Sequence, residues 1–96
     1  MPRWEVVERK YGITSTMKTN ILATIGSAID SRGQSERYKI VNDIKEWLEE
    51  TYGKRWTVLI ADTGSYQLSA SQYDSRFMRV NETNLKWTID VFQQIP

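Results

Sequence analysis

Apolar residues along the chain recur with two spacings, one typical of helices and the other of strands. Two segments in the first half place apolar residues at steps of three and four, which is one face of an α-helix. These residues are Met17, Ile21, Leu22, Ile25, Ala28 and Ile29 in the first segment, and Ile40, Val41, Ile44, Trp47, Leu48 and Tyr52 in the second. The pattern therefore predicts two amphipathic helices.

Hydroxyl residues and glycines indicate where these helices begin and end. Thr14 or Ser15 offers an N-cap oxygen for the first helix, and Gly33 lies in the turn that should follow it. Ser35 is expected to cap the second helix, and Gly53 to end it. Because so few residues separate the two segments, the helices should be antiparallel neighbours.

Two strands are expected directly after the helices. Residues 56–61 form a continuous apolar run, which is typical of a buried strand. A turn at residues 62–64 leads into residues 65–70, which are polar, small and only weakly alternating. Such a strand suits the edge of a sheet, where main-chain N–H and C=O groups remain available to another chain.

The remaining strands are predicted at the two ends of the chain. Residues 3–11 alternate loosely and indicate a peripheral strand or an ordered arm, whereas residues 76–80 indicate a strand. Residues 81–84 are expected to form a hairpin turn. Residues 85–91 alternate strictly, and their buried face would carry Leu85, Trp87, Ile89 and Val91. The predicted order is β-α-α-β-β-β-β, an α+β fold with two antiparallel helices packed on an antiparallel sheet.

The length of 96 residues predicts one domain, 1–96. Its parts would be an N-terminal strand or arm at residues 1–13, a helix pair at 14–53 and a four-strand sheet at 56–93. Gly26 predicts close packing of the first helix against a neighbour, because glycine otherwise weakens a helix by roughly 1 kcal/mol. Three tryptophans fall on apolar faces and are expected in the core, namely Trp47, Trp56 and Trp87. Trp4 is the exception and is expected to pack across a dimer interface.

Charge and composition exclude several classes of function. Thirteen basic and twelve acidic residues are scattered along the chain and give a net charge of +1, so a nucleic-acid binder is not expected. The absence of cysteine and histidine excludes thiol catalysis, a histidine base and cysteine or histidine metal ligands. No apolar run approaches the roughly 20 residues that cross a bilayer, so membrane insertion is not expected.

The acidic residues that could act in catalysis or bind calcium also have simpler explanations. The carboxylates of the second helix, Asp43, Glu46, Glu49 and Glu50, indicate a solvated charged face more readily than a catalytic pair. Residues 30–36 resemble a calcium loop only superficially, because the alternating acidic ligands are missing. We therefore expect no enzyme activity, no cofactor and no metal site.

The chain resembles the dynein light chain family, in its small dimeric peptide-binding type. The matching residues are Ile40, Ile44, Leu48, Tyr52, Trp56 and the run Gly64-Ser65-Tyr66. This resemblance implies a homodimer in which the Gly-Ser-Tyr strand pairs with the partner's sheet, while an extended peptide adds as a strand in the groove beside residues 64–69. The binding and dimer-strand residues that it implies are Gly64, Ser65, Tyr66, Gln67, Leu68, Ser69, Arg37, Tyr38 and Phe77.

The resemblance further implies a non-catalytic binding hub in the cytoplasm, associated with the cytoskeleton. Its implied partners are a second copy of the chain and extended segments of other proteins, the dynein intermediate chain among them. The chain departs from the family where Thr63 replaces an aromatic residue and where Leu68 and Ser69 replace a threonine and a histidine. Arg37 and Tyr38 likewise replace an acidic–basic pair, so the family's glutamine-centred ligand preference does not transfer directly.

Two alternatives stay open at this point. An insertion near residues 73–84 resembles the dynein-light-chain-like half of flatworm tegument calcium-binding proteins, in which an EF-hand half comes first. The chain would then be a fragment or a truncated relative that lies beneath the surface membrane. It would act as a structural or regulatory domain with a degenerate peptide groove. Alternatively, the strand at 65–70 simply completes the sheet of a monomer.

Overall fold

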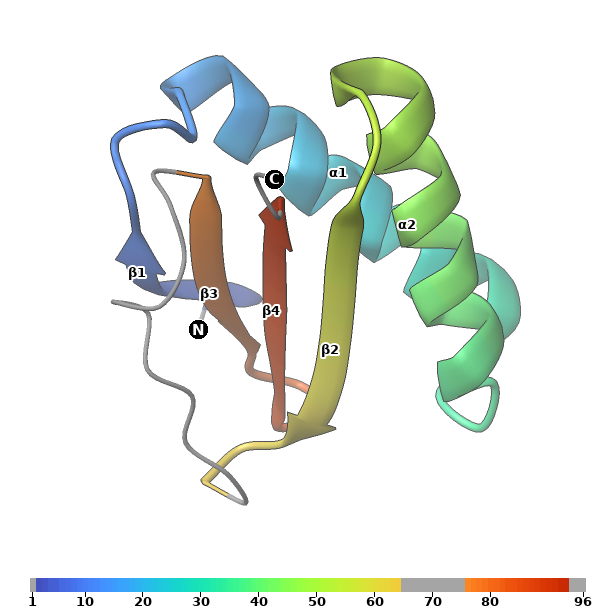
Figure 1. The fold of residues 1–96 in the computed structure, drawn as a ribbon. Coiled ribbons are helices and arrows are strands. Elements are labelled where there is room, and N and C mark those ends of the chain that lie inside the picture. The colour runs from blue at the N-terminus through green and yellow to red at the C-terminus, as the bar shows by residue number, and fades with distance from the viewer. Residues whose placement is uncertain (1, 65–75, 94–96) are drawn as a thin grey trace.

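The computed structural model describes residues 2–64 and 76–93, which form two helices and a four-stranded sheet (Figure 1). In chain order the elements are β1 (Trp4–Arg9), α1 (Ser15–Arg32), α2 (Arg37–Tyr52), β2 (Trp56–Asp62), β3 (Phe77–Glu82) and β4 (Trp87–Gln93). The predicted α+β fold is confirmed, with both helices packed on an antiparallel sheet. The strand expected at 65–70 lies outside the described residues.

Both helices follow the apolar pattern, and one of the two expected N-caps is wrong. The Thr14 hydroxyl accepts the Met17 N–H at 3.1 Å and caps α1, and Gly33 ends this helix. Gly53 ends α2 as expected. The N-cap of α2, however, is Glu36 and not Ser35, and its side chain makes no capping hydrogen bond. The helix therefore begins two residues beyond the serine, at Arg37.

The sheet has the order β1-β3-β4-β2, so that β1 and β2 are its outer strands. Figure 1 shows this order from left to right, with α2 running alongside β2. Strand β2 pairs with β4 in an unbroken register from Trp56–Gln93 to Asp62–Trp87. Strand β1 pairs with β3, and its register shifts between Val6 and Glu8.

The hairpin between β3 and β4 lies two residues further along the chain than expected. The predicted turn at 81–84 is wrong, because β3 continues to Glu82 and β4 begins at Trp87. The carboxylate of Glu82 accepts the backbone N–H groups of Asn84 and Leu85 at 2.6 and 2.9 Å, and Lys86 closes the turn with a φ of 58°. Leu85 consequently lies in the turn and is only partly buried.

The core lies between the helices and one face of the sheet. Its buried members include Met17, Ile21, Ile25, Ile40, Ile44, Leu48, Trp56, Val58, Trp87, Ile89 and Val91, which confirms the apolar faces of both helices and the expected burial of Trp56 and Trp87. Trp47 is partly buried against this core.

Strand β4 is buried on its opposite face as well, contrary to the single buried face expected for it. Asp90 is 0% exposed and accepts two hydrogen bonds from the Arg79 guanidinium, at 2.8 and 3.0 Å. Phe92 stacks on Phe77 with 6.0 Å between the ring centroids. Strict alternation predicted solvent on this side, but an ion pair and an aromatic pair occupy it.

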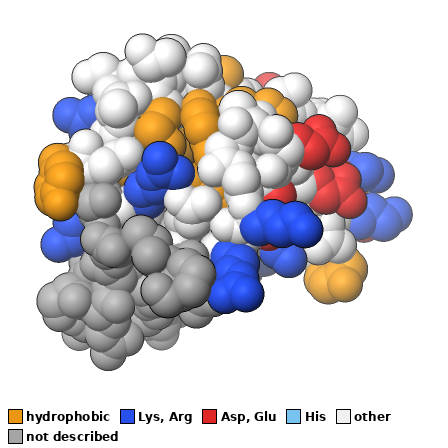
Figure 2. Space-filling view, turned by 45° about the horizontal axis from the view of Figure 1, so that its top comes forward, with side chains coloured by type: hydrophobic (Ala, Val, Ile, Leu, Met, Phe, Trp, Pro, Cys, Tyr) orange, Lys and Arg blue, Asp and Glu red, His pale blue; other side chains and the backbone are white. Residues whose placement is uncertain are grey.

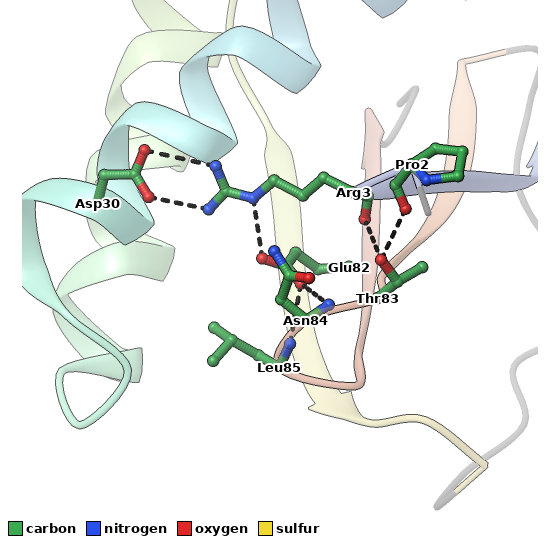
Figure 3. A network of polar contacts seen from close by, with 7 residues as sticks. All are labelled: Pro2, Arg3, Asp30, Glu82, Thr83, Asn84 and Leu85. Atoms are coloured by element: carbon green, nitrogen blue, oxygen red, sulfur yellow. Dashed lines mark hydrogen bonds and ion pairs between the residues drawn. The ribbon is translucent and has the colours of Figure 1, made fainter.

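The N-terminal strand is fastened to the body of the molecule through Arg3 (Figure 3). Its guanidinium donates to Glu82 at 2.9 Å and to Asp30 at 3.0 Å. These hydrogen bonds, to Asp30 first and then Glu82, raise the pKa of Arg3 above its ordinary value. The Thr83 hydroxyl donates to the backbone carbonyl of Pro2 at 2.7 Å.

Trp4 packs within its own chain, and its place at a dimer interface stays a prediction. It is partly buried against the core, and the Arg3 guanidinium lies 5.2 Å from its ring centroid. A Cβ on Gly26 would lie 3.4 Å from the Arg3 guanidinium and 3.5 Å from the Trp4 ring. The neighbours of Gly26 are therefore Arg3 and Trp4, and a Cβ at this position would meet them at ordinary van der Waals distance.

Candidate protein-binding edge

The candidate site is the outer edge of β2 together with the adjoining side of α2. Within the described residues, β2 pairs with β4 alone, and no strand lies on its other side. The interior of β2, residues 57–61, carries no charged side chain. A regular strand with one unpaired side can accept another extended chain by main-chain hydrogen bonding.

The end of β2 is held by a residue of α2. Arg37, the first residue of α2, donates to the Asp62 carboxylate at 3.0 Å, and its guanidinium lies 4.6 Å from the Trp87 ring centroid. An ion pair and a cation–π contact thus fix the point at which β2 turns away. The side chain of Arg37 is committed to these two partners.

The turn after β2 is tied to the turn between β3 and β4. The Thr63 N–H donates to the Lys86 carbonyl at 2.8 Å, and the Thr88 hydroxyl lies 3.3 Å from the Thr63 hydroxyl. Gly64 has a φ of 86°, a left-handed conformation that glycine adopts without strain. No described atom lies within 4 Å of a Cβ built on Gly64, so among the described residues it is the conformation that favours glycine here.

The structure brings only some of the predicted site residues together. Arg37 lies at the Gly64 end of β2 through its pair with Asp62. Tyr38 is 78% exposed. Phe77 lies on the sheet face away from the helices and pairs with Phe92, which is level with Thr57 at the other end of β2. The five remaining residues, Ser65, Tyr66, Gln67, Leu68 and Ser69, lie outside the described residues.

A hollow between α2 and the first half of β2 is the feature that sequence reasoning missed. It has a volume of about 410 Å³ and is lined by Val41, Lys45, Glu49, Arg55, Trp56, Thr57 and Val58. The signal was present in the sequence, because Arg37, Val41, Lys45 and Glu49 recur at steps of four and must share one side of a helix.

The surface around this edge carries charges of both signs. Figure 2 tilts the view of Figure 1 by 45°, so that the end at which α1 begins and α2 ends comes forward, and it shows basic and acidic side chains side by side on the side where α2 lies. This face has no broad area of a single charge. Recognition here would therefore depend on individual side chains more than on a long-range field.

The described residues form neither a metal-binding group nor a membrane-spanning helix. Among residues 2–64 and 76–93, no three acidic side chains come together in a group that could hold a metal ion. Neither α1 nor α2 combines the length and the apolarity that a helix needs to cross a membrane.

Comparison with known proteins identifies the fold. No protein-family model matches the chain, and no curated protein matches it in sequence. The dynein light chain-like domain of the Fasciola hepatica calcium binding protein FhCaBP2 superposes with a TM-score of 0.83 over 100% of this chain and 96% of that one, at 15% identity. Its native crystal form gives a TM-score of 0.81 over 96% of this chain and 91% of that one, at 16% identity.

A dynein-light-chain-like domain of CsTAL3 gives a TM-score of 0.75 over 97% of this chain and 94% of that one, at 17% identity. The fold is therefore that of dynein-light-chain-like domains, as the sequence resemblance implied.

Proposed function

We propose that this chain is a non-catalytic protein-binding domain that acts by strand addition at the outer edge of β2. The observation that carries the proposal is the unbroken seven-residue pairing of β2 with β4, beside an opposite edge without a partner among the described residues. Main-chain hydrogen bonds along such an edge supply affinity, and side chains on alternate positions supply selectivity.

Two kinds of chain would add to the sheet beyond β2, one after the other. A second copy of the protein would contribute its residues 65–70 and form a homodimer, and an extended segment of another protein would then add beside residues 64–69. The dynein-light-chain-like fold supports both steps. The dynein intermediate chain is one partner that the family resemblance suggests.

A second candidate function is a structural or regulatory domain of a larger calcium-binding protein, with a degenerate peptide groove. One observation favours it: Arg37, placed by the resemblance at the ligand, is already bound to Asp62 and Trp87. Two of the similar structures also come from a protein named as calcium binding. In this case the edge of β2 would serve dimerisation or domain contacts alone.

The variant Gly64→Val tests the strand assignment. Valine at a φ of 86° costs about 1–2 kcal/mol and would redirect the chain that follows β2. We expect the dimer to weaken by about tenfold in sedimentation equilibrium, with unchanged helical circular dichroism. Gly64→Asn is the matched control, because asparagine tolerates this conformation and should leave the dimer intact.

Sedimentation of the unmodified protein decides the dimer itself, and a monomer at high micromolar concentration would remove that half of the proposal. Titration with family-type peptides, followed by amide NMR shifts along residues 64–69, separates the two candidate functions. Saturable shifts contradict the degenerate groove, whereas silence contradicts peptide binding for those ligands.

A further inference from the structure

The chain leaves β2 through a short hinge, Asp62-Thr63-Gly64. In the proposed dimer, residues 65–70 follow this hinge and pair with β2 of a second copy. The same residues have a second route, which is to turn back and pair with β2 of their own chain, because its outer edge has no partner among the described residues. The conformation of the hinge therefore selects between a closed monomer and an exchanged dimer.

A tight hairpin needs a turn that this hinge does not form. With Thr63 and Gly64 at the tip, the favoured I′ and II′ turns both require a positive φ at the first position, Thr63. Among the described residues other than glycine, positive φ occurs only at Arg55 and Lys86, so the φ of Thr63 is negative. A negative φ followed by 86° at Gly64 has the signs of a type II turn, which splays the flanking strands apart.

Thr63 is held in this conformation by its own side chain and by its neighbours. Threonine is β-branched, and β-branched residues rarely adopt a positive φ. Its N–H donates to the Lys86 carbonyl at 2.8 Å, and its hydroxyl lies 3.3 Å from the Thr88 hydroxyl. Local sequence and the neighbouring strand thus favour the same turn.

The residue before Thr63 is held by α2. Asp62 forms the last pair of the β2–β4 register with Trp87. Arg37 contacts both, since it donates to the Asp62 carboxylate at 3.0 Å and lies 4.6 Å from the Trp87 ring centroid. These contacts keep Asp62 in the strand and oppose a longer loop that would release it.

We propose that Thr63 is the positioning residue that commits the chain to exchange between two copies. This role rests on the proposed homodimer and adds to it the residue that selects the dimer over the closed monomer. The turn at Thr63 and Gly64 directs residues 65–70 away from their own β2. The edge of β2 is then left for the same residues of the second copy, and by symmetry each copy supplies what the other lacks.

Thr63→Asn tests the proposal, because Asn-Gly is the strongest short sequence signal for a I′ hairpin. Asparagine tolerates a positive φ, so the chain of this variant can return to its own strand. We expect the dimer to weaken at least about tenfold in sedimentation equilibrium, because each copy contributes one hinge. Helical circular dichroism should not change.

A second readout follows the strand itself. In a mixture of isotope-labelled and unlabelled protein, filtered NOE spectra distinguish contacts between chains from contacts within one chain. For the unmodified protein we expect contacts between β2 and residues 65–70 to run between chains. In Thr63→Asn they should run within one chain, which a purely structural loss at position 63 would not produce.

Thr63→Val is the matched control. Valine is also β-branched and disfavours a positive φ, but it lacks the hydroxyl that lies beside Thr88. The dissociation constant of the dimer should therefore change by less than about threefold.

The outcomes separate this proposal from the proposed function. Equal dissociation constants for Thr63→Asn and the unmodified protein would overturn the role of Thr63 and leave the dimer standing. An equal loss in Thr63→Asn and Thr63→Val would also overturn it, because the hydroxyl and not the turn would then matter. A monomeric unmodified protein at high micromolar concentration would contradict both the dimer and the role of Thr63.

Discussion

The two outer strands of the sheet differ in charge, in regularity and in the way each is held. Strand β1 carries Glu5, Glu8 and Arg9 within six residues, and its register shifts at Val7. Strand β2 carries no charge between Trp56 and Asp62, and its pairing with β4 is unbroken. Beyond β1 and β2 the described part of the chain places no further strand.

Charges and bulges are the means by which proteins protect an outer strand from unwanted pairing. Strand β1 has both, and Arg3 fixes its start to Glu82 and Asp30. Strand β2 has no bulge, and its only charged residue is Asp62 at its end. The comparison teaches that one sheet protects one edge and leaves the other suited to a partner, which is the basis of the proposed function.

The largest effect is expected for a variant that releases β1, the protected outer strand. Glu82 is 1% exposed and accepts from Arg3, Asn84 and Leu85, so Glu82→Ala would leave these donors without an acceptor. We expect a loss of about 2–4 kcal/mol in the free energy of unfolding by urea. Amide exchange in β1 should also become faster.

Asp30→Asn is the control for this change. Asp30 also binds Arg3, but its side chain is 68% exposed, so this variant should lose less than about 1 kcal/mol. If both variants unfolded at the same urea concentration, Glu82 would not be the anchor of β1.

A smaller effect is expected at the other edge. Arg37→Ala removes the exposed ion pair with Asp62 and the contact with the buried Trp87 ring. We expect a loss of about 1 kcal/mol, with faster amide exchange at residues 62–64 and no change in β1. Tyr38→Ala, next in the chain and 78% exposed, should change stability by less than about 0.5 kcal/mol. Equal effects of the two variants would contradict the role of Arg37.

The smallest effect is expected for an ion pair between the two helices, away from both outer strands. Arg32 at the end of α1 donates to Asp43 on α2 and holds the pKa of Asp43 below its ordinary value of 3.8. The stabilisation is therefore present above pH 3.8 and is lost as the pH falls through the lower pKa of the folded protein. Urea midpoints measured down to about pH 2 should show this slight loss, and Arg32→Gln should remove it. If Arg32→Gln lost as much stability at low pH as the unmodified protein, the loss would come from other carboxylates.

The helices could be predicted from the sequence because each depends on local periodicity. Ile21, Ile25, Ile40 and Ile44 recur at helical spacing, and all four are 0% exposed. The cap of α2 could not be predicted in this way, because Ser35 is the better capping residue by its side chain and yet the helix begins after Glu36, which makes no capping hydrogen bond. The same holds for the β3–β4 turn, whose position depends on the buried carboxylate of Glu82.

The candidate site was harder to predict because its parts come from different elements. The pairing of Arg37 with Asp62 and Trp87 joins residues from α2, β2 and β4, and periodicity alone cannot bring them together. Burial of Asp90 was missed for a similar reason, since its partner Arg79 lies on another strand. The hollow at Lys45 could be suspected from spacing in α2, but its facing wall at Arg55 could not.

The pairing of β1 with β3 has a consequence for how the protein is made. Trp4 pairs with Glu82 and Arg9 pairs with Met78, so β1 and its partner strand lie near opposite ends of the described chain. During synthesis, β1 therefore leaves the ribosome several seconds before β3, the strand with which it pairs. Closing so long a loop is also slow, because its entropy is lost before the contacts form. Until β3 is available, the charges and the bulge of β1 would disfavour aggregation of the nascent chain.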